Sequence, residues 1–297
     1  MASDLAGTSL SLGFPLSAAA TRALVRAALD EDRAFEDVTT LATVPAEAEG
    51  RAAIVARVAG VIAGLPLAIT AFETMSRDVT VHVVSGDGEH VGAGSVVAEV
   101  AGPWRALLSA ERVALNFVQR LSGVATLTAR YVEAARGTAA RIYDTRKTTP
   151  TLRALQKYAV RCGGGVNHRA DLADGVLIKD NHLAALGGDI ALAVRRARGA
   201  GRPGICIEVE CDDVAQVDAA LAAGADVILL DNMSLDAMRA CAARVAGRVP
   251  LEASGGVTLE RVRAIAETGV DRISVGGLTH SPPALDLGLD YLSSFNS

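Results

Sequence analysis

The spacing of apolar and polar residues differs between the first hundred residues of this 297-residue chain and the remainder. In the first hundred residues, Ser17 to Glu31 has the three- and four-residue spacing of an amphipathic helix. The segments Arg51 to Ala59, Thr80 to Val84 and Val96 to Val100 are short apolar runs, as strands are, and Ser85 to Gly88 is a turn signal between the last two. Helix and strands together predict a small α+β domain.

A long segment with helical spacing follows this domain. Apolar residues recur three and four positions apart from Ala106 to Arg136. Gly123 lies inside the segment, and glycine weakens a helix by about 1 kcal/mol relative to alanine. We therefore expect two helices that break at Gly123 and connect the small domain to the rest of the chain.

From Arg141 onward, short apolar runs alternate with amphipathic helices. The runs are Ile142–Tyr143, Val176–Ile178, Ile205–Val209, Val227–Leu230, Leu251–Ala253 and Ile273–Val275. From the third run onward the spacing is regular and leaves room for a turn, a helix and a second turn. This predicts parallel strands joined by helical crossovers, as in a (β/α) barrel or a doubly wound sheet.

Residues capable of chemistry follow nearly every predicted strand. They are Asp144 to Lys147, Lys179 to Asn181, Glu210, Asp231–Asn232, Ser254 to Gly256 and Gly276–Gly277. A dinucleotide-binding doubly wound sheet opens with a GxGxxG segment after its first strand, and this sequence has none. In barrel enzymes, charged groups at successive strand ends converge on one rim. We therefore predict an α/β barrel with fewer than eight strands.

Composition narrows the class of protein. The chain is 50% hydrophobic but only 3% aromatic, so its core is aliphatic. A net charge of -5 gives no basic field for nucleic acid or an anionic membrane, and we expect neither as a partner. No segment resembles a secretory signal or approaches the roughly 20 apolar residues of a membrane span. The four cysteines form no CxxC pair, which favours buried free thiols and a cytoplasmic location.

The sequence around Arg146 predicts an anion site. Thr145, Arg146 and Lys147 follow the first strand of the second half. Thr149 before Pro150 is a typical start of a helix, which we expect from Pro150 to Cys162 before three glycines. A helix N-terminus beside two cationic side chains attracts anions.

Two further cationic positions and a histidine extend this site. His168 and Arg169 follow the three glycines, and Lys179 ends the next strand. By itself Lys179 is a Schiff-base nucleophile, a phosphate ligand or a salt-bridge partner of Asp180. Near two arginines, an anion ligand is favoured, although cationic neighbours also suit an amine nucleophile.

Carboxylates and glycines complete the rim. Glu210 and Asp231 each close an apolar strand, where a carboxylate needs a cation, a metal ion or a hydroxyl partner. Glu208 is the rival of Glu210, because it shares the strand face but lies further from the strand end. The glycine pairs after the last two strands suit phosphate binding through backbone N–H groups.

These residues, in this order, resemble the quinolinate phosphoribosyltransferases, also called nicotinate-nucleotide pyrophosphorylases (carboxylating). The resemblance covers nearly the whole chain, and its most specific stretches are Asp144 to Pro150, Leu155 to Val160, Gly163 to Arg169, Leu177 to His182, Leu229 to Asn232 and Ser254 to Gly256.

The resemblance implies an N-terminal α/β sandwich, residues 1–120 with the C-terminal segment 283–297, and an incomplete parallel α/β barrel, residues 121–282. It also implies a homodimer, with further assembly left open, in which Arg105 reaches the neighbouring subunit's site. Leu285 to Tyr291 is expected to pack back on the small domain.

For the site, the resemblance implies that Lys147, Lys179, Glu210 and Asp231 are catalytic. Arg105, Arg146, Arg169 and Lys179 are expected to bind the two carboxylates of quinolinate, with His168 nearby. The residues expected to hold phosphoribosyl pyrophosphate are Lys147, Glu210, Asp231, Ser254, Gly255, Gly276 and His280. The remaining expected substrate ligands are Thr145, Gly256, Val275 and Gly277. Mg²⁺ is expected near Glu210 and Asp231, held mainly through substrate.

The implied reaction gives nicotinate mononucleotide, pyrophosphate and carbon dioxide, a step of NAD biosynthesis, with no protein nucleophile or organic cofactor. The chain departs from the family in two places. Thr151 stands where glycine is usual, in what we expect to be a first helical turn, and Ala253 where a serine is common.

Three other hypotheses stay open at this stage. A related class of pyrophosphorylase-like proteins, found with molybdenum transport, shares the fold without needing quinolinate, although the joint presence of Arg105, Arg146, Arg169 and Lys179 favours a dicarboxylate. A barrel aldolase would use Lys179 as a Schiff-base amine. A binding or scaffold protein would leave the charged strand ends without a purpose.

Overall fold

The computed structural model describes residues 12–200 and 202–292 and contains two compact units. The first comprises Met1–Ser122 with Leu285–Ser297, and the second Gly123–Ala284. Residues 1–11 and 293–297, which the sequence prediction assigned to the small domain, lie outside the described residues.

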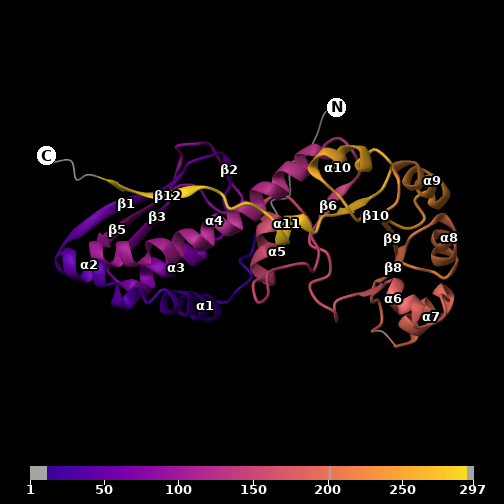
Figure 1. Cartoon of the computed structure of the whole chain (residues 1–297), viewed down its shortest axis with the longest axis horizontal. Coiled ribbons are helices and arrows are strands. Elements are labelled where there is room, and N and C mark those ends of the chain that lie inside the picture. The colour runs from indigo at the N-terminus through magenta and orange to yellow at the C-terminus, as the bar shows by residue number, and fades with distance from the viewer. Residues whose placement is uncertain (1–11, 201, 293–297) are drawn as a thin grey trace, which may run out of the picture. The chain divides into compact units, whose positions relative to one another are not determined.

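An antiparallel sheet in the order β12-β1-β5-β3 organises the first unit (Figure 1). Its strands are β1 (Glu49–Ala56), β3 (Thr80–Val83), β5 (Val96–Pro103) and β12 (Leu287–Leu292), and a separate pair is formed by β2 (Gly60–Val61) and β4 (His90–Val91). β12, from the end of the chain, pairs with β1 over Arg51↔Leu292 to Ala56↔Leu287. The expected return of the C-terminal segment to this unit is therefore present in the structure.

Helices pack against this sheet. They are α1 (Ala18–Glu31), the 3₁₀ helix η1 (Ala34–Glu36), α2 (Val38–Thr43), α3 (Leu65–Met75) and the first part of α4 (Trp104–Ala134). α1 and α3 lie on the same side of the sheet (Figure 1). Ser17 caps α1 by accepting a hydrogen bond from the N–H of Ala20 at 3.2 Å, so the helix predicted from Ser17 to Glu31 begins where its sequence indicates.

α4 is one continuous helix, and the predicted break at Gly123 is wrong. A Cβ atom at Gly123 would lie 2.1 Å from the carbonyl oxygen of Pro283. The glycine therefore serves the close approach of another backbone segment within the second unit. Glycine is favoured both where a helix breaks and where another backbone packs closely, so the sequence alone did not distinguish the two at Gly123.

The second unit is built on a six-stranded parallel sheet in the order β6-β11-β10-β9-β8-β7. Its strands are β6 (Arg141–Tyr143), β7 (Val176–Ile178), β8 (Ile207–Cys211), β9 (Val227–Asp231), β10 (Leu251–Ser254) and β11 (Arg272–Ser274). All six correspond to predicted runs. The first strand, β6, pairs with the last, β11, and no pairing of β6 with β7 is present within the described residues, so the predicted barrel is incomplete.

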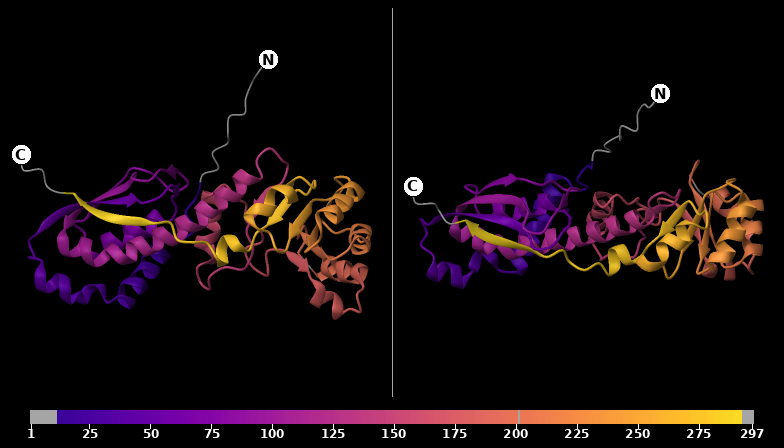
Figure 2. Two further views of the ribbon diagram at one scale, coloured as in Figure 1. Left: turned by 45° about the horizontal axis from the view of Figure 1, so that its top comes forward. Right: turned by 90° about the horizontal axis from the view of Figure 1, so that it is seen from above.

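The crossover helices of the second unit are α6 (Asp180–Ala184), α7 (Ile190–Ala200), α8 (Val214–Ala222), α9 (Leu235–Val245) and α10 (Leu259–Ala266), with α5 (Arg153–Cys162) after β6 and α11 (Gly277–His280) after β11. Figure 2 shows α7 to α10 on one side of the strands. These helices bury the strands, as the apolar run of β9 requires.

α5 begins later than predicted, at Arg153. The N-cap position is Leu152, whose side chain makes no capping bond, and Thr151 has a left-handed backbone with φ of +69°. Gln156 accounts for the difference, because its Oε1 accepts from the N–H of Thr149 at 2.8 Å and its Nε2 donates to the Thr149 hydroxyl at 3.2 Å. Residues 149–152 therefore form a turn, and Thr151 does not lie in a helical turn.

All four cysteines are free, as predicted. Cys162, Cys211 and Cys241 are buried, but Cys206 is exposed, so the expectation of buried thiols is wrong at that position.

None of the helices over the described residues combines the length and the apolar character needed to cross a bilayer.

Candidate active site

A cavity of about 800 Å³ lies at the C-terminal ends of the parallel strands. That volume falls in the usual range for a small-molecule site. The lining includes fourteen of the residues predicted from the sequence: Thr145, Arg146, Lys147, His168, Arg169, Lys179, Glu210, Asp231, Ser254, Gly255, Gly256, Gly276, Gly277 and His280.

Two predicted residues do not line this cavity. Val275 is buried, and its N–H donates to the carbonyl of Tyr143 at 2.9 Å, so it joins β11 to β6. Arg105 belongs to the first unit, where its guanidinium donates to the carbonyls of Val44 at 2.9 Å and Leu41 at 3.2 Å.

The lining also contains residues that the sequence analysis did not select as site residues: Leu177, Leu229, Asn232, Glu252, Val257 and Ser274. Glu252 carried a usable signal, because it is an acidic residue inside the apolar run from Leu251 to Ala253. A buried charge in a strand needs a partner, and that partner is absent from the local sequence.

Two arginines form the cationic part of the cavity. Arg146 follows β6, and its buried Nε has no hydrogen-bond partner among the described residues. Arg169 donates from Nη1 to the carbonyl of Gly175 at 2.8 Å. Burial lowers the pKa of Arg169, and the nearby charge of Arg146 lowers it further. Two partly desolvated cations with spare donors favour an anion between them.

A buried network around Asp144 fixes the loop that carries these arginines. Asp144 forms an ion pair with Lys157 and accepts from Asn167 Nδ2 at 2.6 Å and from the N–H of His168 at 2.9 Å. Lys157 Nζ also donates to the carbonyl of His168 at 2.9 Å. Burial raises the pKa of Asp144, and the Lys157 ammonium opposes that effect. The network ties residues 166–168 to the end of β6.

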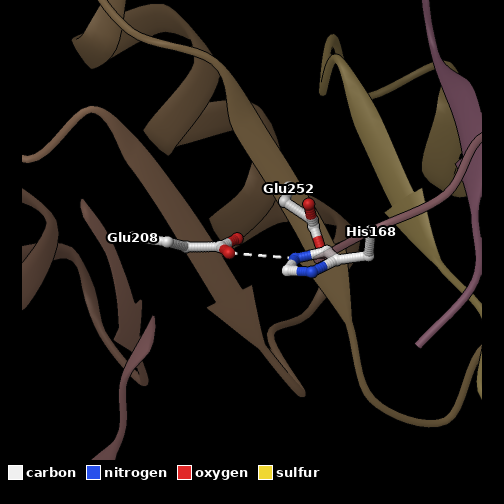
Figure 3. Close-up of side chains that lie close together, drawn as sticks. All are labelled: His168, Glu208 and Glu252. Atoms are coloured by element: carbon white, nitrogen blue, oxygen red, sulfur yellow. Dashed lines mark hydrogen bonds and ion pairs between the residues drawn. The ribbon is translucent and has the colours of Figure 1, made fainter. Parts of the chain in front are cut away.

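His168 lies over two buried carboxylates (Figure 3). Its Nε2 is 2.9 Å from Glu208 Oε2 and 3.4 Å from Glu252 Oε1. Burial lowers the pKa of His168, and hydrogen bonds and charge from both glutamates raise it. The N–H of Arg169 donates to Nδ1, and this bond requires the neutral ring with its proton on Nε2. Burial raises the pKa of Glu208, against the effect of His168. Glu208, the rival of Glu210, therefore contacts the histidine and is not among the residues that line the cavity.

Lys179 and Glu210 form an ion pair at the end of β7 and β8. Lys179 Nζ lies 2.6 Å from Glu210 Oε2, and the lysine side chain is about half exposed. The N–H of Lys179 donates to His182 Nδ1 at 2.9 Å, which makes His182 a cap of α6. The pair places one cation and one carboxylate side by side on the cavity wall.

Asp231 and the glycine loops complete the wall. Asp231 accepts from Asn232 Nδ2 at 2.7 Å, and Asn232 has a left-handed backbone with φ of +53°. A Cβ at Gly255 would lie 2.2 Å from Asn232 Oδ1, so this position excludes any larger residue. Across the cavity, Lys147 packs on Gly276, where a Cβ would be 3.1 Å from Lys147 Cδ.

The donor sets decide which residues could hold a metal ion. Among the described residues, one group of three potential metal ligands lies close together: His168, Glu208 and Glu252. Each offers one ligand atom, and these atoms all lie within 4.8 Å of one another. Glu210 and Asp231 are two carboxylates at neighbouring strand ends. Mg²⁺ is usually bound by one or two carboxylates together with substrate phosphates, and Glu210 and Asp231 fit that requirement.

Known proteins resemble this chain over most of its length. Residues 37–122 match the family model described as Quinolinate phosphoribosyl transferase, N-terminal domain, and residues 124–290 match Quinolinate phosphoribosyl transferase, C-terminal domain. The chain is 46% identical over 277 residues to the nicotinate-nucleotide pyrophosphorylase (carboxylating) of Mycobacterium leprae, covering 91% of this chain and 97% of that protein.

The probable nicotinate-nucleotide pyrophosphorylase (carboxylating) of Bacillus subtilis is 45% identical over 267 residues, which is 90% of this chain and 92% of that protein. The crystal structure of nicotinate-nucleotide pyrophosphorylase from Ehrlichia chaffeensis superposes with a TM-score of 0.87 at 40% identity, covering 93% of this chain and 99% of that chain. Sequence, fold and site agree, and this chain belongs to the quinolinate phosphoribosyltransferase family.

Proposed function

We propose that this chain transfers phosphoribosyl from phosphoribosyl pyrophosphate to quinolinate and releases pyrophosphate and carbon dioxide, giving nicotinate mononucleotide. One observation carries the proposal. A single cavity combines two desolvated arginines with a lysine and two carboxylates at the strand ends. Such a site can hold a dicarboxylate acceptor beside a phosphorylated sugar. The relatives named above carry the same activity in their names.

Arg146 and Arg169 bind the carboxylates of quinolinate, with Lys179 beside them. The free Nε of Arg146 and the lowered pKa of Arg169 support this assignment, because both guanidinium groups gain from a bound dianion. Planar guanidinium groups make paired hydrogen bonds to carboxylates. Thr145 lies at the same strand end and lines the same cavity.

The phosphoribosyl pyrophosphate lies on the opposite part of the wall. Lys147 and His280 supply side chains there, and Ser254 to Gly256 and Gly276–Gly277 supply backbone that a phosphate can approach closely. Glu210 and Asp231 contact the ribose hydroxyls and hold Mg²⁺ together with the substrate. Bound Mg²⁺ would neutralise charge on the pyrophosphate as it leaves.

The pyridine nitrogen attacks the anomeric carbon while pyrophosphate departs, through an oxocarbenium-like state. Glu210 and Asp231 stabilise the positive charge that develops on the ribose, and Lys147 stabilises the leaving group. The ring nitrogen is then cationic, so its charge stabilises the electron pair that stays on the neighbouring ring carbon when the carboxylate departs as carbon dioxide. A proton takes its place on that carbon.

The ion pair at Lys179 argues against a Schiff-base aldolase. Lys179 Nζ lies 2.6 Å from Glu210 Oε2 in an ion pair, and an amine that forms a Schiff base must leave such a partner to attack a carbonyl. Trapping with borohydride in the presence of a carbonyl substrate is expected to leave Lys179 unmodified.

The proposal includes a homodimer that works in the cytoplasm. Arg105 is held by the backbone carbonyls of Leu41, in α2, and of Val44, directly after it, and the Leu41 side chain is exposed. We assign Arg105 to the quinolinate site of a second copy of this chain.

The experiment incubates purified protein with quinolinate, phosphoribosyl pyrophosphate and Mg²⁺ and follows nicotinate mononucleotide by mass and the release of carbon dioxide. Arg146→Ala is expected to lower kcat/KM by about a hundredfold or more, because the quinolinate carboxylate that Arg146 binds would be buried without a partner. Arg239→Ala is the matched control, because this exposed arginine pairs with Asp236 on α9. Release of pyrophosphate with nicotinate but not with quinolinate would instead assign the chain to the related pyrophosphorylase-like class.

A further inference from the structure

Glu208 on β8 and Glu252 on β10 are buried carboxylates, and burial of a charged group lowers the stability of the fold. Their side chains are 5% and 0% exposed, and Glu208 Oε1 and Glu252 Oε2 have no hydrogen-bond partner among the described residues. Apolar residues of similar volume usually serve stability at such positions at least as well as buried ions. A purely structural role therefore does not explain the pair.

Both carboxylates meet at one atom of His168, as Figure 3 shows. Nε2 lies 2.9 Å from Glu208 Oε2 and 3.4 Å from Glu252 Oε1, so this nitrogen carries a proton that points between the two. The hydroxyl of Ser274, on β11, donates to the same Glu252 oxygen. Side chains from three strands of the sheet, β8, β10 and β11, thus converge on one side of the imidazole ring.

The other side of the ring is bonded to the residue that follows. The N–H of Arg169 donates to His168 Nδ1 at 2.8 Å. Residues 163–175 contain no helix or strand, only the isolated bridge between Tyr143 and Val166. The path of the chain at Arg169 therefore depends on side-chain bonds, and His168 supplies the one nearest to the arginine.

We propose that Glu208 and Glu252 are positioning residues that act through His168 and set the placement of Arg169 in the cavity. The inference rests on the proposed function, in which Arg169 binds a carboxylate of quinolinate. The carboxylates hold the ring by Nε2, the ring holds the backbone of Arg169 by Nδ1, and the guanidinium is thereby directed at the acceptor substrate.

The test compares Glu208→Leu and Glu252→Leu with Glu208→Gln. Each leucine variant removes one of the two carboxylates that accept from Nε2–H, whereas the amide oxygen of glutamine keeps an acceptor in place. We expect the leucine variants to raise KM for quinolinate by about tenfold or more and to change KM for phosphoribosyl pyrophosphate by less than about threefold. Glu208→Gln is expected to stay within about threefold of the wild type in both. Glu267→Gln, at an exposed ion pair with Arg263, is the matched control.

Two further measurements separate this role from general damage. The single leucine variants are expected to melt within about 4 °C of the wild type, because each removes one buried carboxylate and leaves the other to accept from Nε2–H. The second measurement is an NMR spectrum of protein with labelled histidine, in which only the five histidines give signals. The signal of the His168 Nε2–H proton is identified by its loss in His168→Gln. We expect that signal to be resolved in the wild type and in Glu208→Gln. It is expected to be lost in a variant that combines Glu208→Leu with Glu252→Leu, where Nε2–H has no carboxylate to donate to.

The outcomes are distinct. An unchanged KM for quinolinate in both leucine variants, or equal rises in KM for both substrates, would overturn the positioning role while leaving the proposed function intact. A wild type that shows the protected Nε2–H signal but does not use quinolinate would overturn the proposed function, and with it the assignment of Arg169 to that substrate. Loss of the signal in Glu208→Gln as well would contradict the hydrogen-bonded arrangement itself.

Discussion

At the scale of single residues, the backbone of Thr151 carries strain that its side chain makes worse. Its φ of +69° lies in the left-handed region, which costs an L-residue about 1–2 kcal/mol and is least suited to a β-branched one. The turn is imposed from outside by Gln156, which bonds to Thr149 through both polar atoms and to the carbonyl of Thr279 at 3.0 Å.

Thr151→Gly is expected to raise the free energy of unfolding by about 1 kcal/mol, because relief of the left-handed strain exceeds the added entropy of the unfolded chain. Thr151→Ala keeps a Cβ and is expected to change stability by less than about 0.5 kcal/mol. Urea denaturation followed by circular dichroism measures both. A glycine variant less stable than the alanine variant would show that the positive φ is not a source of strain.

The candidate site could be predicted from the sequence where each residue follows its own strand. Arg146, Lys179, Glu210 and Asp231 lie at strand ends, and the parallel order brings strand ends to one rim. Glu252 could not be assigned in this way, because its partner His168 comes from a loop 84 positions earlier in the sequence. Residues that work by contacts distant in sequence leave only an indirect trace, here an unexplained acid inside an apolar strand.

At the scale of elements, α4 shows how packing overrides helix propensity. The strands of the second unit were predicted within a few residues because a buried parallel strand leaves a continuous apolar run. The continuation of α4 through Gly123 was not predicted. The glycine is needed for the close approach of the Pro283 carbonyl, which is 160 positions away in the sequence. At the start of α5, the side chain of Gln156, seven positions after Thr149, competed with a good local capping sequence.

Gly123→Ala tests this account. Alanine favours a helix by about 1 kcal/mol over glycine, but its Cβ would lie 2.1 Å from Pro283 O and 3.0 Å from Ala284 Cα, which are backbone atoms that cannot move independently. We expect a net loss of about 1–3 kcal/mol in the free energy of unfolding. Gly199→Ala, in α7 with no atom within 4 Å of the new Cβ, is expected to gain up to about 1 kcal/mol. A gain at both positions would mean that the segment after Thr279 adapts freely to α4.

At the scale of the whole chain, the first compact unit is completed by the last strand. β12 follows the entire second unit in sequence and pairs with β1 along six residue pairs, including Ala53↔Asp290. Leu285, Leu287 and Leu289 are buried, and Arg57 forms an ion pair with Asp290. A chain order of this kind means that the first unit cannot reach its native pairing until the remainder of the sequence is present.

Deletion of residues 285–297 is therefore expected to unfold the first unit. Each buried leucine contributes about 2 kcal/mol, and three of them together approach the 5–15 kcal/mol that stabilises a typical domain. Limited proteolysis with mass analysis is expected to cleave within residues 12–122 of the truncated chain and to spare the second unit. A chain that ends after Leu292 keeps β12 and serves as the control. Equal protection of residues 12–122 in the two truncated chains would show that β1, β3 and β5 form a stable sheet without β12.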